Sequence, residues 1–92
     1  MSGGHFQYQQ HSIGDIADSI KEIIETNDSK EINRWGEPVG RGYSPEVIAR
    51  LEEGVRCLEK AFVYAQRADW LFSSDDSEKS FIERLEKELG KL

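Results

Sequence analysis

Apolar residues recur at helical spacing over residues 13–26. From Ile13 they follow one another at intervals of three and four, whereas a strand would alternate with a period of two. Ser12 is placed to cap this helix, and Asp15 completes a Ser-x-x-Asp capping box. A polar Asn-Asp-Ser sequence ends the pattern. We predict a helix at about 13–26, and an earlier start stays open because the phase extends loosely back to Phe6.

Ser44 and Pro45 open a longer helical pattern. Ser44 suits the N-cap position, and Pro45 suits the first helical position, where its missing amide costs no hydrogen bond. A seam then recurs with the 3-4 spacing that lets helices supercoil around each other. Its members are Ile48, Leu51, Val55, Leu58, Phe62, Ala65, Asp69 and Phe72. We predict a helix at about 45–72.

Two features of this helix bear on its packing. A second row with a spacing of seven consists of Val47, Gly54, Ala61 and Ala68, and its small residues permit close approach of a neighbouring backbone. Asp69 is an acid at a seam position, where an unpaired buried carboxylate is costly. We expect Asp69 to meet Arg67, Arg84 or a cation of a partner chain, to lie on the rim, or to turn outward.

A third helical stripe follows a polar break at residues 73–76. It consists of Phe81, Ile82, Leu85, Leu89 and Leu92. We predict a helix at about 76–90, and no segment alternates as a strand does. The predicted fold is therefore an all-α single domain over 1–92, with an N-terminal arm at 1–12 and a Gly/Arg/aromatic loop at 27–44.

The predicted central helix is long for the size of the chain. Roughly 28 helical residues reach about 42 Å, whereas a compact chain of 92 residues has a diameter of roughly 30–35 Å. Exposing the apolar strip is unfavourable, so we expect a homodimer or higher helical-bundle oligomer. The expected interface is Ile48, Leu51, Val55, Leu58, Phe62, Ala65 and Phe72. The alternative is a monomer in which the first and third helices lie end to end along the central one.

The composition narrows the function classes. The chain has 12 Lys and Arg against 18 Asp and Glu, a net charge of −6 and one cysteine. This balance argues against general affinity for nucleic acid. No apolar run approaches the ~20 residues of a membrane span, and the start does not resemble a signal peptide. We expect a soluble, cytoplasmic protein.

No catalytic signature is present. The sequence lacks a Walker loop, Gly-x-Ser-x-Gly, His-Glu-x-x-His and a paired cysteine motif. Cys57 has no histidine near it in sequence, and His5 and His11 do not have a helical ligand spacing. We therefore expect no enzymatic activity, no metal site and no cofactor.

Two segments carry groups suited to an anionic ligand. Residues 34–43 gather two arginines, two large aromatics and three glycines, and residues 3–8 carry a histidine and two aromatics. Arginine binds phosphate in a bidentate manner, and aromatic rings stack on bases. If the two segments meet across an oligomer, they form a pocket of His5, Phe6, Tyr8, Arg34, Trp35, Arg41 and Tyr43. Alternatively, residues 34–43 only connect helices, with Trp35 and Tyr43 plugging the core.

Several motifs resemble a known group of proteins. They are MSGGHFQY at residues 1–8, IAD at 16–18, YSPEVI at 43–48, YAQRADWL at 64–71 and SDDSEKSF at 74–81. Over most of its length the chain resembles small phage and prophage proteins without an assigned activity. The resemblance implies a phage setting, and it implies no particular reaction.

Three functions are compatible with these patterns. The first is a non-catalytic inhibitor of host defence that sequesters a small anionic, nucleotide-like ligand between subunits. The second is a blocking inhibitor that contacts a host defence protein directly or mimics nucleic acid. Its acidic faces would consist of Glu52, Glu53, Glu59, Asp75, Asp76, Glu83 and Glu86. The third is a structural or assembly component.

Overall fold

The computed structural model describes residues 4–92 as three α-helices. They are α1 (His11–Glu25), α2 (Pro45–Phe72) and α3 (Glu78–Leu89). Within the described residues there is no strand, and an isolated bridge joins Ile32 to Pro38. The all-α fold class is confirmed. Met1, Ser2 and Gly3, which begin the predicted arm, lie outside the described residues.

The bounds of α2 match the prediction. The Ser44 side chain accepts a hydrogen bond from the Val47 amide at 3.3 Å, and Pro45 occupies the first turn. At the other end the Ser73 amide donates to the Asp69 carbonyl at 3.0 Å, and the next residue, Ser74, has a φ of +64°. Local capping therefore fixes both ends of α2.

The start of α1 differs from the prediction. α1 begins at His11, two residues before the predicted first residue, and its N-cap Gln10 makes no side-chain capping bond. Ser12 is inside the first turn, where its amide donates to the Gln9 carbonyl at 3.0 Å. The predicted capping box at Ser12 is therefore wrong, because the turns of the arm run directly into the helix.

The start of α3 is also later than predicted. Ser77 is the N-cap, and its hydroxyl accepts from the Ser80 amide at 3.2 Å. Asp76 precedes this cap and is buried with both carboxylate oxygens in ion pairs. The Asp76 side chain therefore ties the loop to Arg67 of α2 and Arg84 of α3, and α3 begins after this residue.

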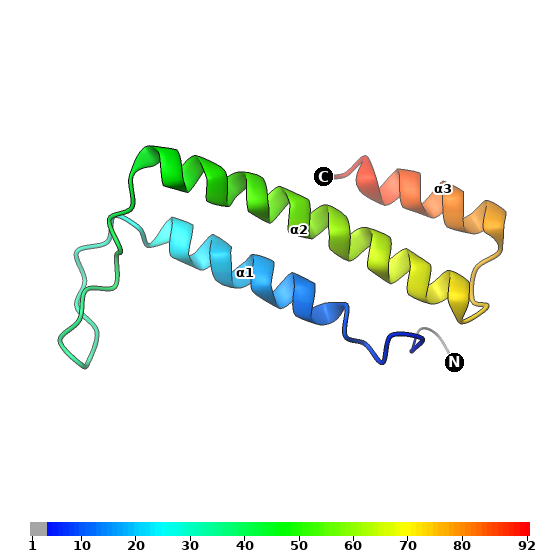
Figure 1. Ribbon diagram of the computed structural model, residues 1–92, viewed down its shortest axis with the longest axis horizontal. Coiled ribbons are helices and arrows are strands. Elements are labelled where there is room, and N and C mark those ends of the chain that lie inside the picture. The colour runs from blue at the N-terminus through cyan, green and yellow to red at the C-terminus, as the bar shows by residue number, and fades with distance from the viewer. Residues whose placement is uncertain (1–3) are drawn as a thin grey trace.

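The three helices lie side by side with α2 in the middle (Figure 1). α1 and α3 each pack against α2, on different flanks, and make no helix–helix contact with each other. The molecule measures 52 × 26 × 14 Å and has a radius of gyration of 17.3 Å. A compact chain of this length has a radius of gyration of about 12 Å. The structure is therefore an elongated layer of helices.

This layer encloses little apolar material. The buried hydrophobic residues of the described chain are Ala17, Val55 and Leu85. Large hydrophobic side chains that are exposed include Ile16, Val47, Tyr64, Phe72 and Ile82. A stable domain normally packs two layers around one core, so one side of this layer lacks a cover. In the described chain, no helix is long and apolar enough to span a membrane.

Candidate functional site

The tip of the loop between α1 and α2 carries an exposed pair of side chains, Arg34 and Trp35. The Arg34 guanidinium lies 4.5 Å from the centre of the Trp35 ring, and Trp35 is 71% exposed. Ile32, on the same loop, is 67% exposed. Trp35 does not plug the core. Its ring offers a free face to a ligand.

The tip of this loop is held by one asparagine. The Asn33 side-chain oxygen accepts hydrogen bonds from the amides of Trp35, at 2.9 Å, and Glu37, at 3.0 Å. The Asn33 amide also donates to the Glu37 carbonyl at 2.8 Å, and Gly36 has a φ of +79°. These bonds define a tight turn that presents Trp35 outward.

A second asparagine clamps the base of the loop. Asn27 is buried, and its side-chain amide pairs with the backbone of Tyr43 in both directions, at 2.8 Å and 3.0 Å. Gly40 lies so close to the backbone of Ser29, on the other side of the loop, that a Cβ on residue 40 would clash with the Ser29 carbonyl oxygen. The sequence did not identify Asn27, Asn33 and Gly40 as the residues that hold the loop in shape. Their only sequence signal is the dense asparagine and glycine content of residues 27–42.

The two loop arginines are available to an anion. Arg34 and Arg41 are both exposed. In the described residues 4–92, no carboxylate lies within ion-pair distance of either guanidinium. Tyr43, at the base, is 41% exposed. The loop therefore combines unpaired positive charge with an aromatic surface.

The N-terminal arm docks on the opposite end of α2. The amides of Gly4 and Phe6 donate to the Asp69 carboxylate at 3.0 and 3.1 Å, and the Gln10 side chain donates to it at 3.3 Å. Asp69 has no exposed surface. The expectation that Asp69 meets a cation or lies at the rim is wrong, because backbone amides of the arm satisfy it.

The charged form of Asp69 is stabilised by these bonds. Burial by itself raises the pKa of the Asp69 carboxyl. The amides of Phe6, Gly4 and His5 and the side chain of Gln10 act in the opposite direction, and the net pKa is lowered. Asp69 is therefore an ionised anchor for the arm and not a proton donor near neutral pH.

Aromatic rings complete the docking of the arm. The His5 ring lies 5.0 Å from the rings of both Phe6 and Phe72, and Phe6 lies 6.0 Å from Phe72. Tyr8 stacks on His11 at 6.3 Å and is 50% exposed. His5 and Phe6 thus pack at the C-terminal end of α2, while Tyr8 stacks on His11 at the start of α1.

An ion-pair network next to the docked arm holds α3. Asp76 accepts from Arg84 at 2.6 Å and from Arg67 at 3.5 Å. The Arg67 guanidinium lies 4.4 Å from the centre of the Trp70 ring. Arg67 and Asp76 are both buried. We interpret this network as structural because its charges are turned toward each other and away from any ligand.

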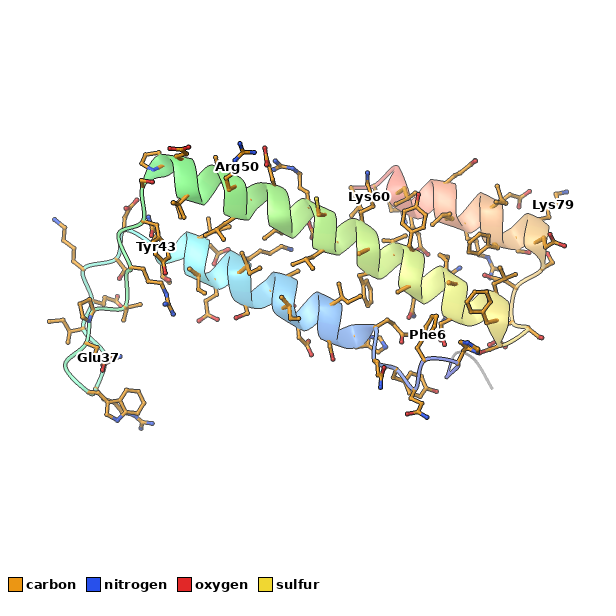
Figure 2. The ribbon with its side chains drawn as sticks, viewed as in Figure 1. Phe6, Glu37, Tyr43, Arg50, Lys60 and Lys79 are labelled. Carbon is orange, nitrogen blue, oxygen red and sulfur yellow. The ribbon has the colours of Figure 1, made fainter. Side chains whose placement is uncertain are left out.

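The seven predicted ligand residues therefore fall into two groups. The arm with Phe6 lies toward the C-terminal end of α2, while residues 34–43 lie beyond its N-terminal end (Figures 1 and 2). Within one chain the two groups do not meet. The composite pocket predicted from the sequence requires a second copy.

The predicted interface seam is also divided. Val55 is buried and lines the α1–α2 boundary with Ile24, and Phe62 contacts Gly14 and lies 5.7 Å from the His11 ring. These two seam members pack inside the chain. The remaining members are half-buried or exposed, and they are Ile48, Leu51, Leu58, Ala65 and Phe72.

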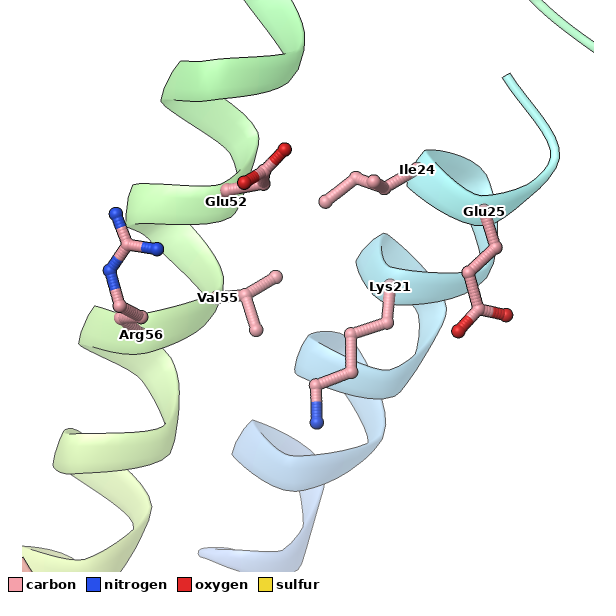
Figure 3. Close-up of a pocket in the computed structure, with 6 residues that line it drawn as sticks. All are labelled: Lys21, Ile24, Glu25, Glu52, Val55 and Arg56. Atoms are coloured by element: carbon pink, nitrogen blue, oxygen red, sulfur yellow. The ribbon is translucent and has the colours of Figure 1, made fainter. Parts of the chain in front are cut away.

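A shallow pocket between α1 and α2 carries mixed charge. It is lined by Lys21, Ile24, Glu25, Glu52, Val55 and Arg56 (Figure 3). Lys21 also pairs with Glu59 at 2.8 Å, and the bond and charge of Glu59 raise the pKa of Lys21. Two cations and two carboxylates in one pocket give no preference for an anionic ligand.

Internal pairing reduces the acidic surface that nucleic-acid mimicry would need. Glu59 is paired with Lys21, Glu53 lies 3.1 Å from Arg50, and Asp76 is buried. Glu53, Glu59 and Asp76 are thus partnered within the chain. No metal-binding group of three His, Cys, Asp or Glu side chains is found in the part of the chain that the structure describes.

Comparison of the chain with protein-family models, curated proteins and solved structures gives no match.

Proposed function

We propose that the protein is a non-catalytic binding protein that holds a small anionic ligand of nucleotide type. The observation that carries this proposal is the exposed Arg34–Trp35 pair on a loop that Asn33 and Asn27 hold in shape. An indole stacked on a base contributes about 1–3 kcal/mol. A guanidinium supplies bidentate, charge-assisted bonds to a phosphate. Because the loop is already ordered by internal bonds, little ordering entropy opposes binding.

The ligand would sit between subunits. Arg34 and Arg41 would bind its phosphates, Trp35 and Tyr43 would stack on its base, and the arm residues His5, Phe6 and Tyr8 of a neighbouring copy would close the site. In the phage setting that the sequence motifs imply, holding such a ligand would sequester a host defence signal. This function needs no chemical step, only affinity and enough copies of the protein.

Ligand titration tests the proposal. We expect cyclic dinucleotides or ADP-ribose-type nucleotides to raise the melting temperature, and native mass spectrometry of protein purified from cells to show a retained small molecule. Arg34→Ala and Trp35→Ala should each reduce affinity at least about tenfold. Ile32→Ala is the matched control, since Ile32 is equally exposed on the same loop and carries no charge or ring. A nucleotide panel that leaves the melting temperature unchanged would overturn the proposal.

A further inference from the structure

One stripe of α2 is turned away from α1, and its last member, Phe72, contacts the arm. Successive residues of a helix turn by about 100°, so a row with alternating spacings of four and three stays on one side. On α2 this row is Val47, Leu51, Gly54, Leu58, Ala61, Ala65, Ala68 and Phe72. It lies about 100° around the helix from the residues that contact α1, such as Val55 and Phe62.

The row is exposed at its two ends and in its middle, and Leu51, Gly54, Leu58, Ala65 and Ala68 are half-buried. Val47 is 42% exposed at one end and Phe72 is 56% exposed at the other, and Ala61 is exposed in the middle. A Cβ built on Gly54 would meet nothing within 4 Å. Small side chains in the middle of the row leave room for a neighbouring helix to approach closely.

The isoleucines of α1 extend this surface. Ile16 is 52% exposed, and Ile13, Ile20 and Ile23 are half-buried. This stripe lies about 100° around α1 from its α2-facing residues. On both helices, the same sense of rotation about the axis leads from the residues that face the other helix to the exposed stripe. Because α1 and α2 are antiparallel (Figure 1), the two stripes lie on the same side of the layer. One side of the molecule is therefore a continuous apolar face.

The surface area is large enough for a stable dimer. The chain has an accessible surface of 6860 Å². A compact protein of 10.5 kDa exposes about 5,400 Å², so the excess is roughly 1,400 Å². A standard protein–protein interface buries about 800 Å² on each partner. The excess thus exceeds what one dimer interface requires.

We propose that a second copy of this chain covers the apolar face, with the two α2 helices antiparallel about a two-fold axis. Centred between residues 59 and 60, this arrangement places Val47 opposite Phe72 of the partner copy. The pairs Leu51–Ala68, Gly54–Ala65 and Leu58–Ala61 follow in turn. Each leucine then faces an alanine, so that a large side chain packs against a small one at these positions. A parallel pairing would instead set leucine against leucine and alanine against alanine.

The antiparallel dimer also completes the binding site, and this part rests on the function proposed above. The two-fold axis brings the N-terminal end of each α2 beside the C-terminal end of the other. Arg41 and Tyr43 precede the first of these ends, and the arm with His5 and Phe6 is docked at the second. Each dimer would thus carry two equivalent sites, one at each end of the paired helices.

Sedimentation of the full chain tests the dimer. We expect the wild type to be dimeric at micromolar concentration and Ala61→Glu to raise the dimer dissociation constant at least about 100-fold. The matched control is Ala49→Glu, an exposed alanine on the other side of the same helix, which should remain dimeric. Circular dichroism should show the same helicity for both variants. A monomeric wild type, or an equal effect of both substitutions, would overturn the proposal.

Crosslinking tests the register. In a Cys57→Ser background, chains with Gly54→Cys and chains with Ala65→Cys are mixed and treated with a short bismaleimide. We expect crosslinks between the two kinds of chain and few within either kind. Crosslinks confined to like chains would indicate parallel helices and overturn the register.

The two proposals fail in different ways. If the wild type and Ala49→Glu are dimeric but no nucleotide binds, the dimer stands and the proposed function is wrong. If nucleotide binds equally well to wild type and to monomeric Ala61→Glu, the function stands and the shared site is wrong. Loss of nucleotide binding by Ala61→Glu, with the fold retained, would support both.

Discussion

The two ends of α2 use their polar side chains in different ways. At the C-terminal end, the buried Asp69 carboxylate accepts hydrogen bonds from amides of the arm, and buried Arg67 and Asp76 form an ion pair. At the N-terminal end, Asn27 and Asn33 use their hydrogen bonds on the backbone of the loop and leave Arg34 unpaired and exposed. Polar groups at the first end hold the fold, whereas those at the second are free to bind.

A buried charge at one end of α2 serves the fold, whereas an exposed charge at the other end is available to a ligand. A buried carboxylate must be matched by several donors, and removing them leaves a costly unpaired group. An exposed arginine on an ordered turn costs little to maintain and remains available to a ligand. Substitutions at the two ends should therefore affect stability and binding in opposite proportions.

The largest effect is expected for Asp69→Asn. The neutral side chain keeps one oxygen acceptor, and the NH2 group that replaces the other oxygen cannot accept from the amide of Gly4 or Phe6 that it faces. We expect the melting temperature to fall by about 10 °C. Asp18→Asn, on the exposed side of α1, should change it by less than about 2 °C. Equal melting temperatures for the two variants would show that the arm contributes nothing to stability.

Asn27→Ala should have an intermediate effect. Its side chain makes two hydrogen bonds to Tyr43 from a buried position, and both are lost. We expect the melting temperature to fall by about 5 °C and nucleotide affinity to fall with it, because the loop loses its shape. Thermal denaturation and calorimetry on the same samples would measure both. An unchanged affinity would mean that the base of the loop does not organise the site.

A smaller effect is expected from acid. The folded pKa of Asp69 is below its ordinary value, so its contribution to stability is complete above about pH 4 and is lost as the pH falls through the lowered pKa. The melting temperature of the wild type should therefore fall more steeply than that of Asp69→Asn as the pH is lowered below about 4. Parallel pH profiles for the two proteins would contradict this assignment.

The sequence predicted α2 well because its determinants are local. Ser44 and Pro45 define the first turn, and the apolar spacing extends to Phe72. The role of Asp69 could not be predicted in the same way, since its donors Gly4 and Phe6 are 65 and 63 positions away. Sequence spacing also did not reveal that Val55 and Phe62 face α1 while Gly54 and Ala61 face outward.

The loop shows a similar limit. Its arginines, aromatics and glycines indicated a binding segment, but the orientation of Trp35 depends on hydrogen bonds from Asn33 and on the close approach at Gly40. The seven candidate ligand residues were predicted as one set, and in one chain they lie in two. The separation of the two groups follows from the fold of the whole chain. The proposed dimer would bring one group of each copy close to the other group of its partner.

The bond between Phe6 and Asp69 also imposes an order on synthesis. Because 63 positions separate the two residues, the arm has no docking partner until most of the chain has left the ribosome. The residues of the arm are therefore synthesised well before the carboxylate that fixes them in the folded chain.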